Sequence, residues 1–175
     1  MANRRPIQQA HERTNVALFL DWFNHAYHSN FKVVSEPNPP EAVIRSSSTT
    51  RWVEVSTAFW NEAYAKDIYS YATPGEACKP VGNGPHQCMD SVFAASFVSV
   101  VKKKLEKKSY VPWRDQYGPG YLVVPIQTPW LDEQTLGCMQ EAWAASTVNN
   151  LGCFRSVYIA FPSNNVIRFS RWTSK

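Results

Sequence analysis

The pattern of apolar and polar residues is most regular between residues 39 and 66, where it predicts two strands and a helix. The first strand is the short apolar run at 42–44, and the second, at 51–57, is rich in aromatic and β-branched residues. The polar residues 46–50, Ser-Ser-Ser-Thr-Thr, form the turn between them, and a helix at about 57–70 follows. This order predicts a β-hairpin that leads into a helix.

Glu54 is a carboxylate inside the second strand. Successive side chains of a strand point to opposite faces. Val53 and Val55 should therefore face one way, whereas Trp52, Glu54 and Ser56 face the other. Glu54 is thus placed on a strand that is otherwise suited to burial, which makes it a candidate functional residue.

The apolar patterns outside this region predict one α/β domain that spans residues 1–175. The run at 121–126 is apolar throughout, which suits a central strand covered on both faces. Residues 111–120 are expected to form a loop. The other expected elements are helices at 7–28, at 90–108 with Asp90 as the N-cap and at 131–147, and strands at 31–35, 154–161 and 166–170. Together they predict a sandwich in which helices flank a mixed central sheet.

Composition and charge narrow the classes of function. Hydrophobic residues make up 44% of the chain, enough for an ordinary core, whereas charged residues make up 18% and aromatic residues 14%. Such a chain tends to expose some apolar surface, which is typical of an interface with a partner or with a second copy in a homodimer. The net charge of +4 and the pI of about 8.9 are compatible with nucleic acid as a partner.

The cellular compartment is predicted from two features, a signal peptide and a membrane-spanning segment. The N-terminal residues MANRRP are not followed by the apolar stretch of a signal peptide. No run approaches the roughly 20 apolar residues that cross a membrane. We therefore expect a soluble, cytoplasmic protein with no membrane partner, in which the four cysteines are reduced thiols.

A second carboxylate, Glu41, opens the first of the two paired strands. If these strands form a hairpin, Glu41 and Glu54 can come together at one end of it. Two carboxylates at a sheet end suit a hard divalent cation such as Mg²⁺, which takes oxygen ligands and completes its shell with water and phosphate. The alternative is structural, because Arg45 and Arg51 could pair with these carboxylates.

Residues 40–41 and 54–56, in this order of elements, resemble the core of the PD-(D/E)XK nuclease superfamily, which has the restriction-endonuclease-like fold. Pro40-Glu41 stands where the family has Pro-Asp, and Glu54-Val55-Ser56 stands where it has an acidic-x-Lys tripeptide. The resemblance implies a three-layer sandwich and a metal-dependent nuclease that hydrolyses phosphodiesters in DNA or RNA. It also implies that Glu41 and Glu54 are catalytic residues that hold Mg²⁺ or Mn²⁺.

The chain departs from the family pattern at Ser56, where the motif has a lysine. A serine replaces poorly a lysine that helps to position and deprotonate the attacking water. Some family members supply the lysine from the following helix, which makes Lys66 the candidate catalytic replacement. Lys66 also lies four residues after Glu62, as in an ordinary helix ion pair. Ser56 and Gln127 are auxiliary site candidates. The alternative is a catalytically inactive nuclease fold that acts as a nucleic-acid-binding or protein-interaction module.

The one dense cluster of charge lies at the end of the helix expected at 90–108, with the sequence KKKLEKK. One interpretation is a nucleic-acid-binding patch that contacts phosphates. The other is that lysines favour a helix C-terminus because of the macrodipole, and the two can hold together. The candidate binding residues are Lys102, Lys103, Lys104, Lys107 and Lys108.

Residues 71–88 form the least regular segment and contain Cys78, His86 and Cys88. A zinc site would need a fourth ligand and usually has a closer pair of cysteines. Zinc is therefore a less favoured interpretation, as is a disulfide between Cys78 and Cys88. Unligated thiols are the expectation for this segment.

Overall fold

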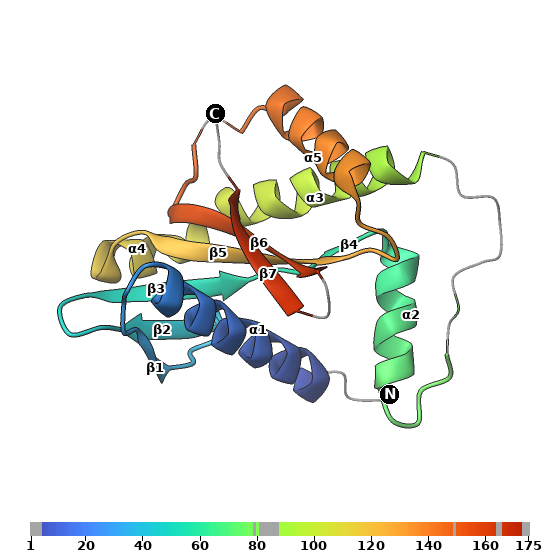
Figure 1. Cartoon of the computed structure of the whole chain (residues 1–175). Coiled ribbons are helices and arrows are strands. Elements are labelled where there is room, and N and C mark those ends of the chain that lie inside the picture. The colour runs from blue at the N-terminus through green and yellow to red at the C-terminus, as the bar shows by residue number, and fades with distance from the viewer. Residues whose placement is uncertain (1–4, 79, 81–87, 149, 164–165, 173–175) are drawn as a thin grey trace.

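The computed structural model describes residues 5–78, 80, 88–148, 150–163 and 166–172 of the chain. Within them a seven-stranded sheet has the order β1-β2-β3-β5-β6-β7, and β4 pairs with β5 beyond the end of β3 (Figure 1). The strands are β1 (Lys32–Ser35), β2 (Ala42–Arg45), β3 (Thr50–Val55), β4 (Ala58–Phe59), β5 (Gly120–Gln127), β6 (Phe154–Ser163) and β7 (Val166–Trp172).

The sheet is mixed, as the sequence predicts. β1, β2 and β3 form an antiparallel meander, and β7 closes the other edge antiparallel to β6. The central strands β3, β5 and β6 are parallel, and seven of the eight residues of β5 are buried. A parallel strand with neighbours on both sides and helices on both faces accounts for the apolar run that marks β5.

Helices cover both faces of the sheet. α1 (Arg5–Ala26) lies across one face, and α3 (Met89–Leu105) lies with α5 (Glu133–Ala145) on the other (Figure 1). α2 (Glu62–Ala72) stands beside β4, and a 3₁₀ turn, η1 (Lys108–Tyr110), leads into α4 (Val111–Tyr117). The prediction of an α/β sandwich with a mixed sheet flanked by helices is confirmed.

Two cores result, one on each face of the sheet. Val53 and Val55 pack beneath α1, whereas Trp52 lies in the core beneath α3 and α5. The alternation expected along the second strand is therefore confirmed. Glu54 shares the α3 face with Trp52, and this placement brings a carboxylate into contact with the end of α3.

Three local predictions differ from the structure. Asp90 is not the N-cap of α3, because the helix begins at Met89, and Asp90 instead accepts a hydrogen bond from Thr135 on α5. Residues 58–59 form strand β4 rather than a helix, and Asn61 caps α2 by accepting from the backbone N–H of Tyr64. Residues 111–117 are helical, since a proline in the first turn of a helix has no N–H to leave unpaired.

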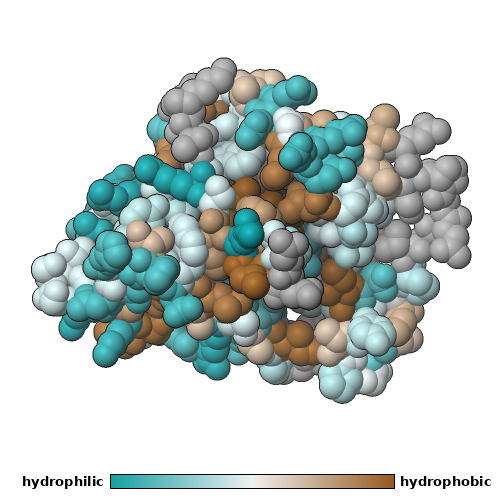
Figure 2. Space-filling model, in the orientation of Figure 1, coloured by the Kyte–Doolittle hydropathy of each residue, from teal (hydrophilic) through white to brown (hydrophobic). Residues whose placement is uncertain are grey.

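An apolar groove of about 400 Å³ lies between α5 and the edge of the sheet. Figure 2 shows hydrophobic side chains at the surface in this area, with hydrophilic residues around them. Trp143, Phe161 and Trp172 are among its lining residues. Exposed apolar surface of this kind agrees with the aromatic-rich composition, and a homodimer remains a prediction.

Candidate functional site

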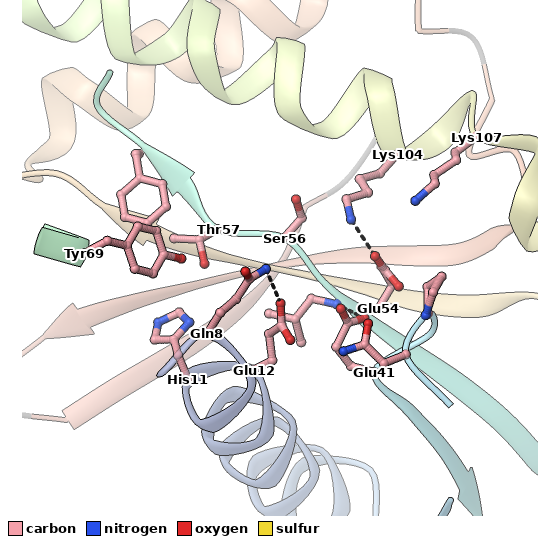
Figure 3. A pocket seen from close by; sticks show the side chains of 14 residues that line it. Gln8, His11, Glu12, Glu41, Glu54, Ser56, Thr57, Tyr69, Lys104 and Lys107 are labelled. Atoms are coloured by element: carbon pink, nitrogen blue, oxygen red, sulfur yellow. Dashed lines mark hydrogen bonds and ion pairs between the residues drawn. The ribbon is translucent and has the colours of Figure 1, made fainter. Parts of the chain in front are cut away.

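A cavity of about 350 Å³ opens where β3 ends, between the first turns of α1 and the last turns of α3 (Figure 3). We call it the carboxylate pocket. Three glutamates, Glu12, Glu41 and Glu54, and two lysines, Lys104 and Lys107, contribute to its walls. The rest of the described lining consists of Gln8, His11, Asn38, Pro39, Val55, Ser56, Thr57, Phe59 and Tyr69.

The register of the hairpin brings Glu41 and Glu54 together. Ala42 pairs with Val53, so one step further along the antiparallel ladder places Glu41 opposite Glu54. The turn sets this register, because Arg45 pairs with Thr50 and the backbone N–H of Ser46 donates to the carbonyl of Thr49. The two carboxylates therefore meet at one end of the hairpin, as the sequence predicts.

Glu54 is almost completely buried, with 1% of its surface exposed. Its Oε1 accepts hydrogen bonds from Lys104 Nζ at 2.5 Å and from the hydroxyl of Tyr110 at 2.6 Å. Its Oε2 is also buried but has no hydrogen-bond donor among the described residues. Leaving a buried anionic oxygen without a donor costs free energy. A proton or a cation beside Oε2 would remove this cost.

Packing holds the Tyr110 hydroxyl against Glu54. The Tyr110 ring stacks on Trp52 at a centroid separation of 5.4 Å, and Trp52 Nε1 donates to the carbonyl of Gly118. Gly120 makes room for the Trp52 ring, since a Cβ at position 120 would collide with that ring. Burial, and then the negative charge of Glu54, raise the pKa of Tyr110, so the phenol stays protonated as a donor.

Glu41 faces the open side of Glu54. Its Oε2 accepts a hydrogen bond from the backbone N–H of Val55 at 3.3 Å. Burial, and then the neighbouring Glu54 carboxyl group, raise the pKa of Glu41 to about 9. Two buried carboxylates cannot both be charged without compensation. A proton on Glu41 supplies it in the absence of any ion, and a divalent cation between the two would supply it equally well.

Helix α1 adds a carboxylate that the sequence analysis did not identify. Glu12 lines the pocket from the side opposite α3 and accepts a hydrogen bond from Gln8 at 2.9 Å (Figure 3). Burial raises the pKa of Glu12 and lowers that of His11. One signal for this face was available, because Gln8, His11, Glu12 and Asn15 recur at helical spacing beside an apolar stripe.

The structure does not bring Lys66 into the carboxylate pocket. Its side chain is 62% exposed, and Nζ lies 3.7 Å from the Glu62 carboxylate in the alternative helix ion pair. The lysine that reaches Glu54 is Lys104, whose side chain is 25% exposed. Ser56 does line the pocket, but Gln127 does not, and its carbonyl accepts from the backbone N–H of Trp60.

The five lysines of the cluster do not point the same way. Two line the carboxylate pocket, one contacts Thr147 just after α5, and two are exposed to solvent. Lys104 and Lys107 line the carboxylate pocket, and Lys107 Nζ lies 5.2 Å from the centre of the Tyr110 ring. Lys102 points toward α5, donating to Thr147 at 3.1 Å, and also lies 3.9 Å from a Glu106 carboxylate oxygen. Lys103 and Lys108 are exposed. A continuous phosphate-binding patch made of all five lysines remains a prediction, and only two of them reach the pocket.

The donor set of the pocket fits a hard cation held by two carboxylates. Glu41 and Glu54 offer oxygen ligands, and Mg²⁺ commonly uses one or two carboxylates with water in the remaining positions. Across the described residues, no three His, Cys, Asp or Glu side chains are grouped as a ready-made metal site. Cys78 and Cys88 are exposed, unpaired thiols, and His86, the third residue considered for zinc, lies outside the described residues.

No family model matches this chain, and no curated protein or solved structure matches it either. None of the described helices is long and apolar enough to cross a membrane.

Proposed function

We propose that this chain is a metal-dependent phosphodiester hydrolase in which Glu41 and Glu54 hold Mg²⁺ or Mn²⁺. One observation carries the proposal. The buried Oε2 of Glu54 has no donor among the described residues and faces Glu41, whose pKa is raised to about 9 by burial and by Glu54. A divalent cation would satisfy both carboxylates at once. The resemblance of residues 40–41 and 54–56 to the PD-(D/E)XK nucleases supports the same assignment.

We assign to Lys104, which reaches Glu54 from α3, the role that the family pattern gives to the lysine of its motif. The bound ion would polarise a phosphoryl oxygen and lower the pKa of a water. Lys104 Nζ holds Oε1 of Glu54, which orients the other oxygen, Oε2, toward Glu41. Its charge at the pocket wall would also stabilise the negative charge that develops on the phosphate.

Two further side chains have roles on the walls of the carboxylate pocket. Lys107 is exposed, lines the pocket just after the end of α3 and would contact a substrate phosphate. Glu12 lies across from Lys104, and because burial raises its pKa it would be a stronger base for the proton of the attacking water than an exposed glutamate is. Substrate would then lie between α1 and the end of α3.

The test is cleavage of single- and double-stranded DNA and RNA with Mg²⁺ or Mn²⁺ by wild type and by Glu54→Gln. We expect metal-dependent cleavage that falls by at least about a hundredfold in the variant, because a neutral amide binds a divalent cation poorly. Glu141→Gln is the matched control, since Glu141 is an exposed glutamate on α5 that does not line the pocket. Equal rates for wild type and Glu54→Gln on every substrate would refute the proposal.

The alternative is a nuclease fold that binds nucleic acid without cutting it. Ser56 at the motif lysine position favours this alternative, since a lost lysine is a common mark of lost chemistry. The two are separated by whether wild type cleaves, and Lys104→Met then identifies the lysine that acts. If wild type cleaves and Lys104→Met does not, Lys104 has replaced the motif lysine. If wild type binds oligonucleotides with no cleavage at any metal concentration, the alternative is correct.

A further inference from the structure

A second cavity, of about 380 Å³, lies at the other end of the same strands, beneath the last turns of α1. We call it the arginine–tyrosine cavity. Three arginines and three tyrosines supply its polar groups: Arg51, Arg155, Arg171, Tyr27, Tyr121 and Tyr158. It shares no lining residue with the carboxylate pocket.

The charges around this cavity are all positive. No acidic side chain belongs to its described lining. Arg51 is held by two backbone carbonyls, those of Thr50 at 3.0 Å and Tyr117 at 2.9 Å, so its charge is not neutralised. Arg155 and Arg171 are exposed and form no ion pair with a carboxylate of the described residues. Three guanidinium groups that line one cavity without a counter-charge in its described lining suit an anion.

The tyrosines add hydrogen-bond donors and a stacking surface. Burial raises the pKa values of Tyr121 and Tyr158, and a hydrogen bond with Tyr27 adds to the shift at Tyr158, so both phenols keep their protons and Tyr121 can donate to an anion. The Tyr27 ring packs on Phe23 at a centroid separation of 4.5 Å and is itself 50% exposed. A half-exposed ring that is supported from behind can stack on a planar aromatic ligand.

We propose that the arginine–tyrosine cavity binds a nucleotide phosphate, with the phosphate among Arg51, Arg155 and Arg171 and the base against Tyr27. Guanidinium groups match the planar edges of a phosphate, and the aromatic wall selects a phosphate that carries a base. The volume of about 380 Å³ lies within the range usual for small-ligand sites. The site needs no metal, so it stands apart from the proposed hydrolase activity.

The probes separate the two sources of such a phosphate. Adenosine 5′-monophosphate represents a free nucleotide, and a 5′-phosphorylated single-stranded oligonucleotide represents a nucleic acid strand. Glycerol 3-phosphate carries the phosphate without the base. Binding of each to the full chain is measured by calorimetry in EDTA, which removes any contribution from a metal in the carboxylate pocket.

We expect the monophosphate or the oligonucleotide to bind at least about tenfold more tightly than glycerol 3-phosphate, because only the first two can stack on Tyr27. Tighter binding of the oligonucleotide that is lost in the variant Arg155→Gln/Arg171→Gln assigns the site to a strand, whereas equal binding of the two probes, lost in the same variant, assigns it to a free nucleotide. The double variant Arg155→Gln/Arg171→Gln should weaken binding by at least about tenfold, since hydrogen bonds to charged groups are the strong ones.

Arg168→Gln is the matched control. Arg168 is exposed on the same strand as Arg171 and does not line the cavity, so the variant loses one charge there without changing the site. It should bind as wild type does. The proposal is wrong if the double variant binds as tightly as Arg168→Gln, if glycerol 3-phosphate binds as well as the nucleotide, or if no probe binds wild type. Loss of cleavage in Glu54→Gln has no bearing on any of these outcomes.

Discussion

The carboxylate pocket and the arginine–tyrosine cavity lie at opposite ends of the same strand and under opposite ends of the same helix. β3 carries Arg51 near its start and Glu54 near its end, and α1 contributes Glu12 to one site and Phe23 to the other. One site gathers three carboxylates and the other three guanidinium groups. The chain thus separates its site charges along the strand direction.

The two sites differ in how their charge is compensated. In the carboxylate pocket Lys104 neutralises Glu54 directly, and Glu41 is left with a raised pKa of about 9. In the arginine–tyrosine cavity the exposed Arg155 and Arg171 are compensated by solvent. A buried charge depends on its internal partner, whereas an exposed charge does not. The acidic site is therefore part of the fold's stability, and the basic site is available to a ligand at little cost.

The largest expected effect removes the internal cation from the acidic site. Lys104→Met leaves Glu54 buried with only the Tyr110 hydroxyl as a donor. Breaking a buried pair costs about 3–5 kcal/mol, and the partial exposure of Lys104 and the remaining donor reduce this to about 2–4 kcal/mol. Urea unfolding in EDTA, followed by tryptophan fluorescence, measures the difference in the free energy of unfolding.

Two control variants make this result specific. Lys103→Met changes the adjacent exposed lysine, and Arg171→Gln removes a cation from the arginine–tyrosine cavity. Each should alter the free energy of unfolding by less than about 0.5 kcal/mol, as for most surface substitutions. If Arg171→Gln destabilises as much as Lys104→Met, the two sites are equally structural and the contrast between them fails.

A second effect on stability is the pH dependence that Glu41 confers. Its pKa is raised from 4.5 in the unfolded chain to about 9 in the folded one. The stabilisation from the bound proton is fully present below about pH 4.5 and is lost as the pH rises through about 9. Glu41→Gln is neutral throughout, so its free energy of unfolding should fall less than that of wild type between about pH 6 and 9.

Mg²⁺ should reverse the effect of pH in wild type. An ion that binds Glu41 must displace its proton, so stabilisation by Mg²⁺ should increase from about pH 6 to 9. Urea unfolding at both pH values, with Mg²⁺ or with EDTA, measures this. Glu141→Gln, altered at an exposed glutamate of α5, should behave as wild type does. The same pH slope in Glu41→Gln and wild type would mean that Glu41 carries no proton in the folded chain.

The sequence was sufficient to predict the hairpin and its two carboxylates. Alternation along residues 51–57 placed Glu54 correctly. The turn was expected at 46–50, and in the structure it spans 46–49, which gives the register that pairs Glu41 with Glu54. The strand alternation and the hairpin turn both depend on neighbouring residues, so they can be predicted from the sequence alone. The coarse α/β architecture followed for the same reason, since the buried strand β5 and the long helices have strong periodicity.

The source of the lysine was not predictable in this way. Lys104 lies fifty residues after Glu54, in a run of lysines that look alike in the sequence. Only the packing of α3 against the sheet turns Lys104 toward Glu54 and leaves Lys103 in solvent. Lys66 satisfied the sequence rule for a replacement from the next helix. Because strand β4 occupies residues 58–59, that helix begins only at Glu62, and Lys66 lies outside the carboxylate pocket.

The smallest expected effect is that of Lys66→Met, and it separates the sequence-based site from the structural one. The ion pair with Glu62 is exposed at both ends, so its loss should cost no more than about 0.5 kcal/mol. Cleavage should stay within about twofold of wild type, because Lys66 does not line the carboxylate pocket. Lys104→Met, assayed beside it under the same metal and salt conditions and in conditions where both variants are folded, should lose most of the activity. The reverse result, with Lys66→Met inactive and Lys104→Met active, would return the catalytic lysine to α2 and leave Lys104 as a structural partner of Glu54.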